Sequence, residues 1–149
     1  MGMNLSYCTN YRPFGGEQPG TSSHVSEELL ARRVLVVDDE NLIRWSLVQT
    51  LSDHGFAVEE AANGADAVKI AAASGDRFDV VLLDFRLPDS NDLKLLARMK
   101  QLLPHAALIL MTAFSTPEVA RSALDLGAVR VVHKPFEMND MAKFVKQAC

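Results

Sequence analysis

The segment "FDVVLLD", Phe78–Asp84, decides the fold of this chain. Val80–Leu83 is apolar at every position, so a strand here would bury both of its faces. Strands of that kind belong to the middle of a parallel sheet that is covered on both sides. The apolar run ends abruptly in Asp84, and "FRLPDSND" follows with a proline and two more acids. The segment therefore predicts a central strand that holds a carboxylate at the edge of the sheet.

The chain around this segment alternates between two patterns. From Arg33 onward, short apolar runs are separated by segments that carry apolar residues at helical spacing. Asn63 is expected to cap a helix, and Trp45 to pack with Leu42 and Val48. Five strand–helix repeats predict an α/β domain with a parallel sheet between two layers of helices. We expect strands at 33–37, 56–62, 78–84, 106–111 and 128–132, and helices at 40–55, 63–75, 92–103, 116–127 and 137–148.

The composition is that of one globular domain. A chain of 149 residues can bury a single core, and a net charge of −4 gives no electrostatic reason to expect contact with nucleic acid. No apolar run is long enough to span a bilayer, so we expect no membrane contact. Cys8 and Cys149 stand at opposite ends, without the spacing of a disulfide framework, which favours a reducing compartment. Residues 1–32 predict a flexible N-terminal arm, in which a short helix near 26–32 is one option, and 33–149 forms the domain.

Polar groups follow the predicted strands at the edge where such sheets bind ligands. Three of these groups are carboxylates, and the others include a hydroxyl and an ammonium. Because the carboxyl ends of parallel strands meet at one edge, we expect these groups to converge. They are Asp38 and Asp39 after the first strand, Asp84 after the third, Thr112 after the fourth, and His133, Lys134 and Pro135 after the fifth.

Three carboxylates in one pocket repel one another by about 4 kcal/mol per pair at about 4 Å. Either a pKa rises or a cation lies among them, and an all-oxygen ligand set suits Mg²⁺. Lys134 and Thr112 would suit an incoming phosphoryl group, for which an aspartate beside them can act as nucleophile. The residues alone therefore predict a metal-assisted phosphoryl acceptor site.

Each of these residues also has a simpler interpretation. Asp38 and Asp39 could bind backbone donors at a helix N-terminus, Thr112 could be a turn residue, and Lys134 a solvated loop lysine. Their coincidence at one edge favours a shared site. We expect Asp89 and Asp92 to be turn residues, and the four histidines, which have no ligand spacing, to be structural or surface residues: His24, His54, His105 and His133.

Four motifs resemble those of response-regulator receiver domains: "VLVVDDE", "LLDFRLPD", "LILMTA" and "VVHKPF". The resemblance runs from about Arg33 to the C-terminus and looks most like receivers of nitrogen-regulator-type transcriptional activators. It implies a flavodoxin-like, doubly wound, five-stranded sheet in the order 2-1-3-4-5. It also implies a phosphoacceptor signalling domain rather than an enzyme, although the domain takes part in its own phosphoryl transfer and autodephosphorylation.

The resemblance implies a role for each motif residue. Asp84 would accept the phosphoryl group, Lys134 would pair with Asp84 and then with the phosphoryl oxygens, and Thr112 would move to hydrogen-bond that group. The Lys134–Pro135 peptide bond would be cis. The Mg²⁺ ligands would be Asp38, acting through water, together with Asp39, Asp84 and the backbone carbonyl of Arg86.

Two positions depart from the family pattern. Receivers usually carry an aromatic residue three positions before the lysine, where this chain has Val131. They commonly have glycine at the position of Asp92, where we expect the chain to turn left-handed. Arg86 and Phe114 occupy variable positions beside the pocket that tune phosphoryl-transfer rates in this family.

The leading hypothesis is a cytoplasmic two-component receiver that takes its phosphoryl group from a sensor histidine kinase. Its expected output is a homodimer or partner interface on the fourth helix, fifth strand and fifth helix. The alternative, suggested by Val131, is a phosphorylation-independent interaction module on the same fold. A hydrolytic phosphatase is disfavoured because no second acid stands two residues after Asp84. The family resemblance also favours a longer regulator with an output domain after Cys149.

Overall fold

The central strand β3 (Val80–Asp84) is buried along its whole length, as its sequence predicts. The computed structural model describes residues 31–149, so the predicted arm and its optional helix lie almost wholly outside the described residues. On either side of β3 lie β1 (Arg33–Val37) and β4 (Ala107–Thr112). The edge strands are β2 (Ala57–Ala61) and β5 (Ala128–His133). All pairings are parallel and the order is β2-β1-β3-β4-β5, which confirms the implied fold.

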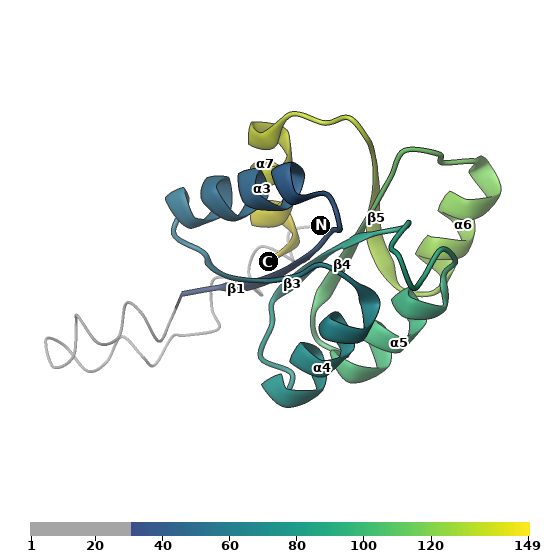
Figure 1. Cartoon of the computed structure of the whole chain (residues 1–149), viewed down its shortest axis with the longest axis horizontal. Helices are drawn as coiled ribbons and strands as arrows, with labels where there is room; N and C mark the ends of the chain where they lie inside the picture. Colours follow the sequence, from purple (N-terminus) through teal and green to yellow (C-terminus); the bar gives the residue numbers. More distant parts are fainter. Residues whose placement is uncertain (1–30) are drawn as a thin grey trace, which may run out of the picture.

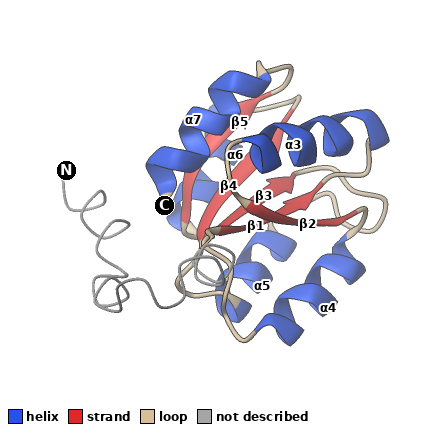
Figure 2. Cartoon of the chain, turned by 90° about the vertical axis from the view of Figure 1, so that its left-hand side faces the viewer, coloured by secondary structure: helices blue, strands red, loops and turns tan. Residues whose placement is uncertain are grey.

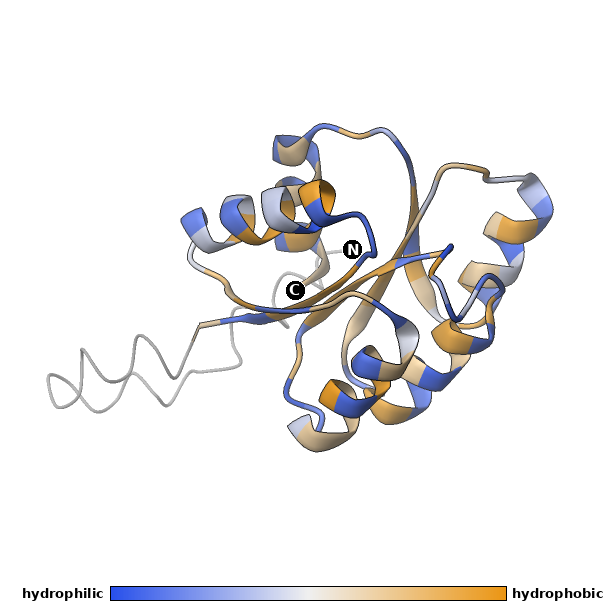
Figure 3. Cartoon of the chain, in the orientation of Figure 1, coloured by the Kyte–Doolittle hydropathy of each residue, from blue (hydrophilic) through white to orange (hydrophobic). Residues whose placement is uncertain are grey.

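Helices cover both faces of the sheet. On one face lie α3 (Asn41–Asp53) and α7 (Met138–Ala148), and on the other lie α4 (Gly64–Ser74) and α5 (Lys94–Leu102), with α6 (Pro117–Asp125) toward the β5 edge (Figures 1 and 2). Each predicted element is present, and its bounds differ from the prediction by two residues at most. Two apolar cores result, one on each face. Figure 3 shows hydrophobic residues along the central strands, and hydrophobic and hydrophilic residues alternating along the helices.

Local sequence signals account for several helix ends. The side chain of Asn63 accepts a hydrogen bond from the amide of Asp66 and caps α4, as predicted, and Gly75 ends that helix in the left-handed conformation with φ 69°. Thr116 caps α6 in the same way through the amide of Val119. Among the described residues, no helix is long and apolar enough to cross a membrane.

The prediction that Trp45 packs with its neighbours was wrong. The side chain of Trp45 is 60% exposed and that of Leu42 is 73% exposed. The face of α3 that meets the sheet is formed instead by Leu47 and Leu51, which are buried one turn apart, with Ile43 partly buried against the same core. Trp45 lies two residues before Leu47 and so points to the opposite side of the helix. Apolar residues at helical spacing occur on more than one side of α3, and the side that packs against the sheet is the one with Leu47 and Leu51.

Candidate functional site

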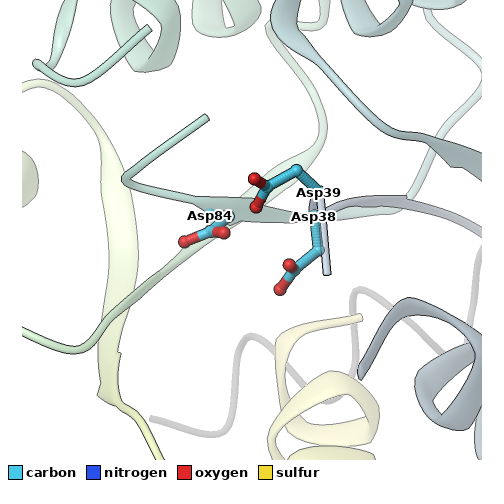
Figure 4. Close-up of side chains that lie close together, drawn as sticks. All are labelled: Asp38, Asp39 and Asp84. Carbon is cyan, nitrogen blue, oxygen red and sulfur yellow. The ribbon is translucent and has the colours of Figure 1, made fainter. Parts of the chain in front are cut away.

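The carboxyl ends of β1 and β3 bring three acidic side chains together. One oxygen of each of Asp38, Asp39 and Asp84 lies within 4.8 Å of the other two. Asp38 and Asp84 are buried, with 0% and 6% of their surface exposed, whereas Asp39 is exposed. Figure 4 shows the side chains of Asp38 and Asp39 leaving the end of β1 in different directions, with Asp84 beside them. The predicted convergence of these acids is therefore present in the fold.

Lys134 is the cation at the centre of this cluster. Its Nζ lies 3.0 Å from Asp38 Oδ2, 2.9 Å from Glu40 Oε1 and 3.3 Å from Asp84 Oδ2. The ammonium has three hydrogens, so these acceptors can engage all of its donors. The backbone holds the lysine in place, because the Lys134 amide donates to the Thr112 carbonyl at 2.8 Å. The Lys134–Pro135 bond is cis, as the resemblance implies.

Glu40 also contacts Lys134, and its role in this cluster was not predicted from the sequence motifs. It stands directly after Asp39, with its side chain largely exposed, and it holds Lys134 from the solvent side. The only sequence signal was an additional acid beside the two aspartates. Because Lys134 lies 94 residues further along the chain, only the tertiary structure reveals the pair.

Thr112 lies at the end of β4, next to the strand that carries Asp84. Its side chain is 1% exposed, and its Oγ1 accepts a hydrogen bond from the amide of Phe114 at 3.0 Å. The strand register pairs Asp84 with Met111, so Thr112 stands one residue beyond Asp84 at the same edge. The hydroxyl is therefore at the edge where the carboxylates meet.

Arg86 and Phe114 flank the cluster on the surface. The guanidinium of Arg86 lies 4.9 Å from the centre of the Phe114 ring, and both side chains are exposed. The Arg86 amide donates to Asp84 Oδ1 at 3.3 Å, a long hydrogen bond that ties the carboxylate to its own loop. Val131, at the family's aromatic position, is half-buried in β5 and packs against the core on the α4, α5 and α6 face.

The expected left-handed turn at Asp92 is absent, so that prediction was wrong. Among the described residues, Asp76 is the only residue other than glycine with a positive φ. Asp92 Oδ1 instead accepts a hydrogen bond from the Lys94 amide at 2.9 Å, at the start of α5. The carboxylate thus serves as a local helix acceptor, and the loop does not require a glycine there.

The electrostatics of the cluster reflect burial first and an excess of negative charge second. Burial, followed by the charge of Asp38, raises the pKa of Asp84 from 3.8 to about 7, against the opposing effect of Lys134. Burial lowers the pKa of Lys134, but its hydrogen bonds to Glu40 and Asp38 and the charges of Asp38 and Asp84 together outweigh that effect, so the net pKa lies above its ordinary value. Lys134 therefore stays charged, while the raised pKa leaves part of the Asp84 population protonated at neutral pH.

The oxygen donors fit a hard divalent cation. The three carboxylates lie close together, and the ammonium of Lys134 is shared by Asp38, Asp84 and Glu40. A further cation would favour the ionised form of Asp84, whose pKa is raised by burial and by the charge of Asp38. Oxygen ligands that leave room for water are the set that Mg²⁺ prefers. The donor set of this cluster therefore fits Mg²⁺.

The sequence of this chain is similar to those of known signalling proteins. Sporulation initiation phosphotransferase F of Bacillus subtilis is 31% identical over 80% of this chain and 94% of its own length. The DNA-binding transcriptional regulator NtrC of Escherichia coli is 36% identical over 77% of this chain, but the match spans only 24% of NtrC.

Solved structures match over a similar range. A CheY-like receiver domain protein from Methanospirillum hungatei has a TM-score of 0.74 at 29% identity, covering 78% of this chain and 92% of that one. A Burkholderia pseudomallei response regulator, solved with a phosphorylated aspartic acid, a calcium ion and citrate, has a TM-score of 0.68 at 28% identity, covering 77% and 71%.

The family model of the response regulator receiver domain matches residues 34–146, which include every member of the acidic cluster. Receiver domains are phosphorylated by histidine kinases and generally bind Mg²⁺ at an acidic pocket. The chain belongs to the response regulator receiver domain family, the phosphoacceptor domains of two-component signalling.

Proposed function

We propose that Asp84 is the phosphoacceptor of this receiver and that its donor is a phosphohistidine of a sensor kinase. The observation that carries this assignment is the cluster of Asp38, Asp39 and Asp84 with Lys134 bound to Asp84. The Asp84 carboxylate, ionised when it reacts, attacks phosphorus as the bond between phosphorus and the imidazole nitrogen breaks. The imidazole leaves and takes up a proton, and the product is an acyl phosphate on Asp84.

The neighbouring residues would support this transfer in distinct ways. Lys134 already lies 3.3 Å from Asp84 and would follow the new negative charge onto the phosphoryl oxygens. Thr112 would donate its hydroxyl to the same group after a short movement. In autodephosphorylation, Asp84 would be the leaving group instead of the nucleophile: water would attack phosphorus, and Asp84 would leave as a carboxylate while inorganic phosphate is released.

We assign the Mg²⁺ ligands to Asp39, Asp84 and the carbonyl of Arg86, with Asp38 acting through water. When bound, Mg²⁺ would neutralise the charge that gathers on the phosphoryl oxygens. The cluster of three acids, of which only Asp39 is exposed, supports this assignment, because Asp39 can meet an incoming hydrated cation. We place the reaction in the cytoplasm, consistent with the lack of a disulfide framework.

For the output, we propose a dimer or partner interface on α6, β5 and α7, the fourth helix, fifth strand and fifth helix of the domain. Three exposed apolar residues at the α6–β5 end of this surface support the proposal. These residues are Leu124, Leu126 and Val129, with 49%, 40% and 56% of their surface exposed.

A titration with beryllofluoride and Mg²⁺ tests the acceptor assignment. Amide resonances of Asp84, Thr112 and Lys134 should shift in the wild-type domain, because beryllofluoride on an aspartate imitates a phosphoryl group. Asp84→Asn, which keeps the shape of the side chain but removes its charge, is the matched control and should show no such shifts. An unchanged wild-type spectrum would contradict the proposal.

Val131 supports a second candidate function, a phosphorylation-independent interaction module. A valine that is already half-buried in β5 has no ring to swing between two positions when Thr112 moves. Dimerisation of wild-type and Asp84→Asn proteins, each with and without acetyl phosphate, separates the two functions. Phosphate-dependent association of the wild type alone supports the leading function, whereas identical association in all four samples supports the alternative.

A further inference from the structure

The turn after β3 is attached to α4 by one side chain. Asp89 Oδ1 accepts a hydrogen bond from the Gly64 amide at 2.7 Å, and Asp89 Oδ2 accepts one from the Ala65 amide at 2.9 Å. These amides are the first two of α4, which have no partners within the helix. The carboxylate thus supplies from another segment, 25 residues further along the chain, the acceptors that a helix N-terminus lacks.

Asn63 satisfies the next amide of the same helix from within its own segment. Its Oδ1 accepts from the Asp66 amide at 2.8 Å, so the first three amides of α4 are shared between Asn63 and Asp89. Both residues cap one helix by the same kind of hydrogen bond. They differ in that Asn63 joins α4 only to itself, whereas Asp89 joins α4 to the turn that follows the phosphoacceptor strand.

That turn is tightly organised. Leu87 and Ser90 exchange backbone hydrogen bonds, with the Leu87 amide 2.7 Å from the Ser90 carbonyl and the Ser90 amide 3.2 Å from the Leu87 carbonyl. Leu87 is 7% exposed and anchors the turn in the core. Arg86, directly before it, donates its amide to Asp84 Oδ1. A continuous set of contacts therefore runs from α4 through Asp89 and this turn to the carboxylate of Asp84.

Gly64 allows the close approach of the two segments. A Cβ at this position would stand 3.1 Å from Asp89 Oδ1 and 3.2 Å from Leu95 Cδ2, closer than ordinary contacts. The same hydrogen bonds act on the carboxylate, since the Gly64 amide contributes most to holding the pKa of Asp89 below its ordinary value. Asp89 is thus ionised at neutral pH and fitted against a helix end that favours negative charge.

We propose that Asp89 is a positioning residue of the phosphoacceptor site, holding the turn that carries Arg86 and thereby the carboxylate of Asp84 in the arrangement that takes up Mg²⁺. The inference rests on the proposed function, because it concerns the metal affinity of the same site. Asp89 does not touch the metal, and it acts through the backbone between Arg86 and Ser90.

The test compares Asp89→Ala with Asn63→Ala in the otherwise intact chain. Mg²⁺ affinity is measured by amide chemical shifts, and loop opening by hydrogen exchange of the Arg86 and Leu87 amides without metal. Both variants should lower stability to a similar extent, since each removes capping from α4. Only Asp89→Ala should speed exchange in the turn and weaken Mg²⁺ binding, by about fivefold, the factor that corresponds to one capping interaction. Asp89→Asn, which keeps one acceptor oxygen, should fall between wild type and Asp89→Ala.

A second variant, Gly64→Ala, perturbs the contact between Gly64 and Asp89 from the α4 side. Gly64→Ala leaves the loop sequence intact and improves helix propensity, yet its Cβ would press on Asp89 Oδ1. It should also weaken Mg²⁺ binding, even if stability is unchanged. Equal Mg²⁺ affinity in wild type, Asp89→Ala and Gly64→Ala would overturn this inference but not the proposed metal site. A wild-type domain that does not bind Mg²⁺ would overturn the proposed metal site and this inference together.

Discussion

The two ends of the sheet handle charge in opposite ways. At the carboxyl ends, Asp38 and Asp84 are buried with Lys134, and the acids outnumber the base. At the amino ends, Arg33 forms an ion pair with Glu59 near the surface, and Asp76 contacts the exposed ring of His105. A buried excess of one charge costs stability, so its presence favours a functional site. Buried, crowded acids therefore distinguish the proposed site at the carboxyl ends from the amino ends of the sheet.

The largest expected effect is the loss of phosphorylation on changing Asp84. Asp84→Asn should abolish modification by acetyl phosphate with Mg²⁺, because the amide is not a nucleophile of comparable strength. Intact-protein mass spectrometry gives the fraction carrying one phosphoryl group. Asp79→Asn is the control. Asp79 lies at the amino end of the sheet, where its carboxylate accepts a hydrogen bond from the Arg33 amide, so this change should leave phosphorylation intact. Modification of Asp84→Asn at the wild-type level would place the acceptor elsewhere.

A smaller but substantial effect is expected when the central ammonium is removed. Lys134→Met should lower the free energy of unfolding at pH 8 by about 3 kcal/mol, because buried Asp38 and Asp84 lose their cation. Arg33→Met should lower it by less than about 1 kcal/mol, since Glu59 is exposed to water. Urea denaturation of both variants measures the difference. Equal losses would show that the two ends of the sheet do not differ in this way.

The pH dependence of Asp84 gives a third comparison. Its pKa in the folded state, about 7, lies above 3.8, so the folded protein binds more protons between these values. The stability linked to this proton is fully present below about pH 3.8 and is lost as pH rises through about 7. Without metal, Asp84→Asn should therefore raise stability at pH 8 by about 1–2 kcal/mol, less than the full shift implies, because Lys134 loses a partner and water screens the pocket.

Denaturation in a chelator at pH 5 and pH 8 measures this effect. The gain from Asp84→Asn should shrink at pH 5, where Asp84 is already protonated in the folded protein. Excess Mg²⁺ should stabilise the wild type and not the variant, which would reverse their order. A gain that is the same at both pH values would exclude the raised pKa as its cause.

The smallest effect belongs to the pair of His105 and Asp76. His105→Asn should change stability by less than about 0.5 kcal/mol, because the histidine side chain is 76% exposed. The variant should bind Mg²⁺ as the wild type does, since His105 precedes β4 and lies at the opposite end of the sheet. A change in Mg²⁺ affinity, measured by amide chemical shifts, would show that the two ends are coupled.

Much of the fold could be predicted because its signals are local. The apolar run Val80–Leu83 predicts a buried strand, and Asn63 predicts the start of α4, without knowledge of any other segment. Trp45 shows the limit of such signals, because the helical pattern predicted α3 correctly but not which of its sides faces the sheet. Asp92 shows a second limit. The family preference for glycine suggested a left-handed backbone at this position, but the Asp92 carboxylate accepts a hydrogen bond from the Lys94 amide, and its backbone is not left-handed.

The sequence by itself determined the order of strands and helices and the residues that stand at the strand ends, because hydrophobic periodicity and turn residues act over a few positions. Family resemblance supplied the order of the strands within the sheet and the proposed roles of Asp84 and Lys134. Only the tertiary structure decided that Glu40 shares Lys134 and that Asp89 caps α4. Such contacts join residues far apart in the chain, and their geometry depends on how the sheet aligns its strands and on how each helix packs against it.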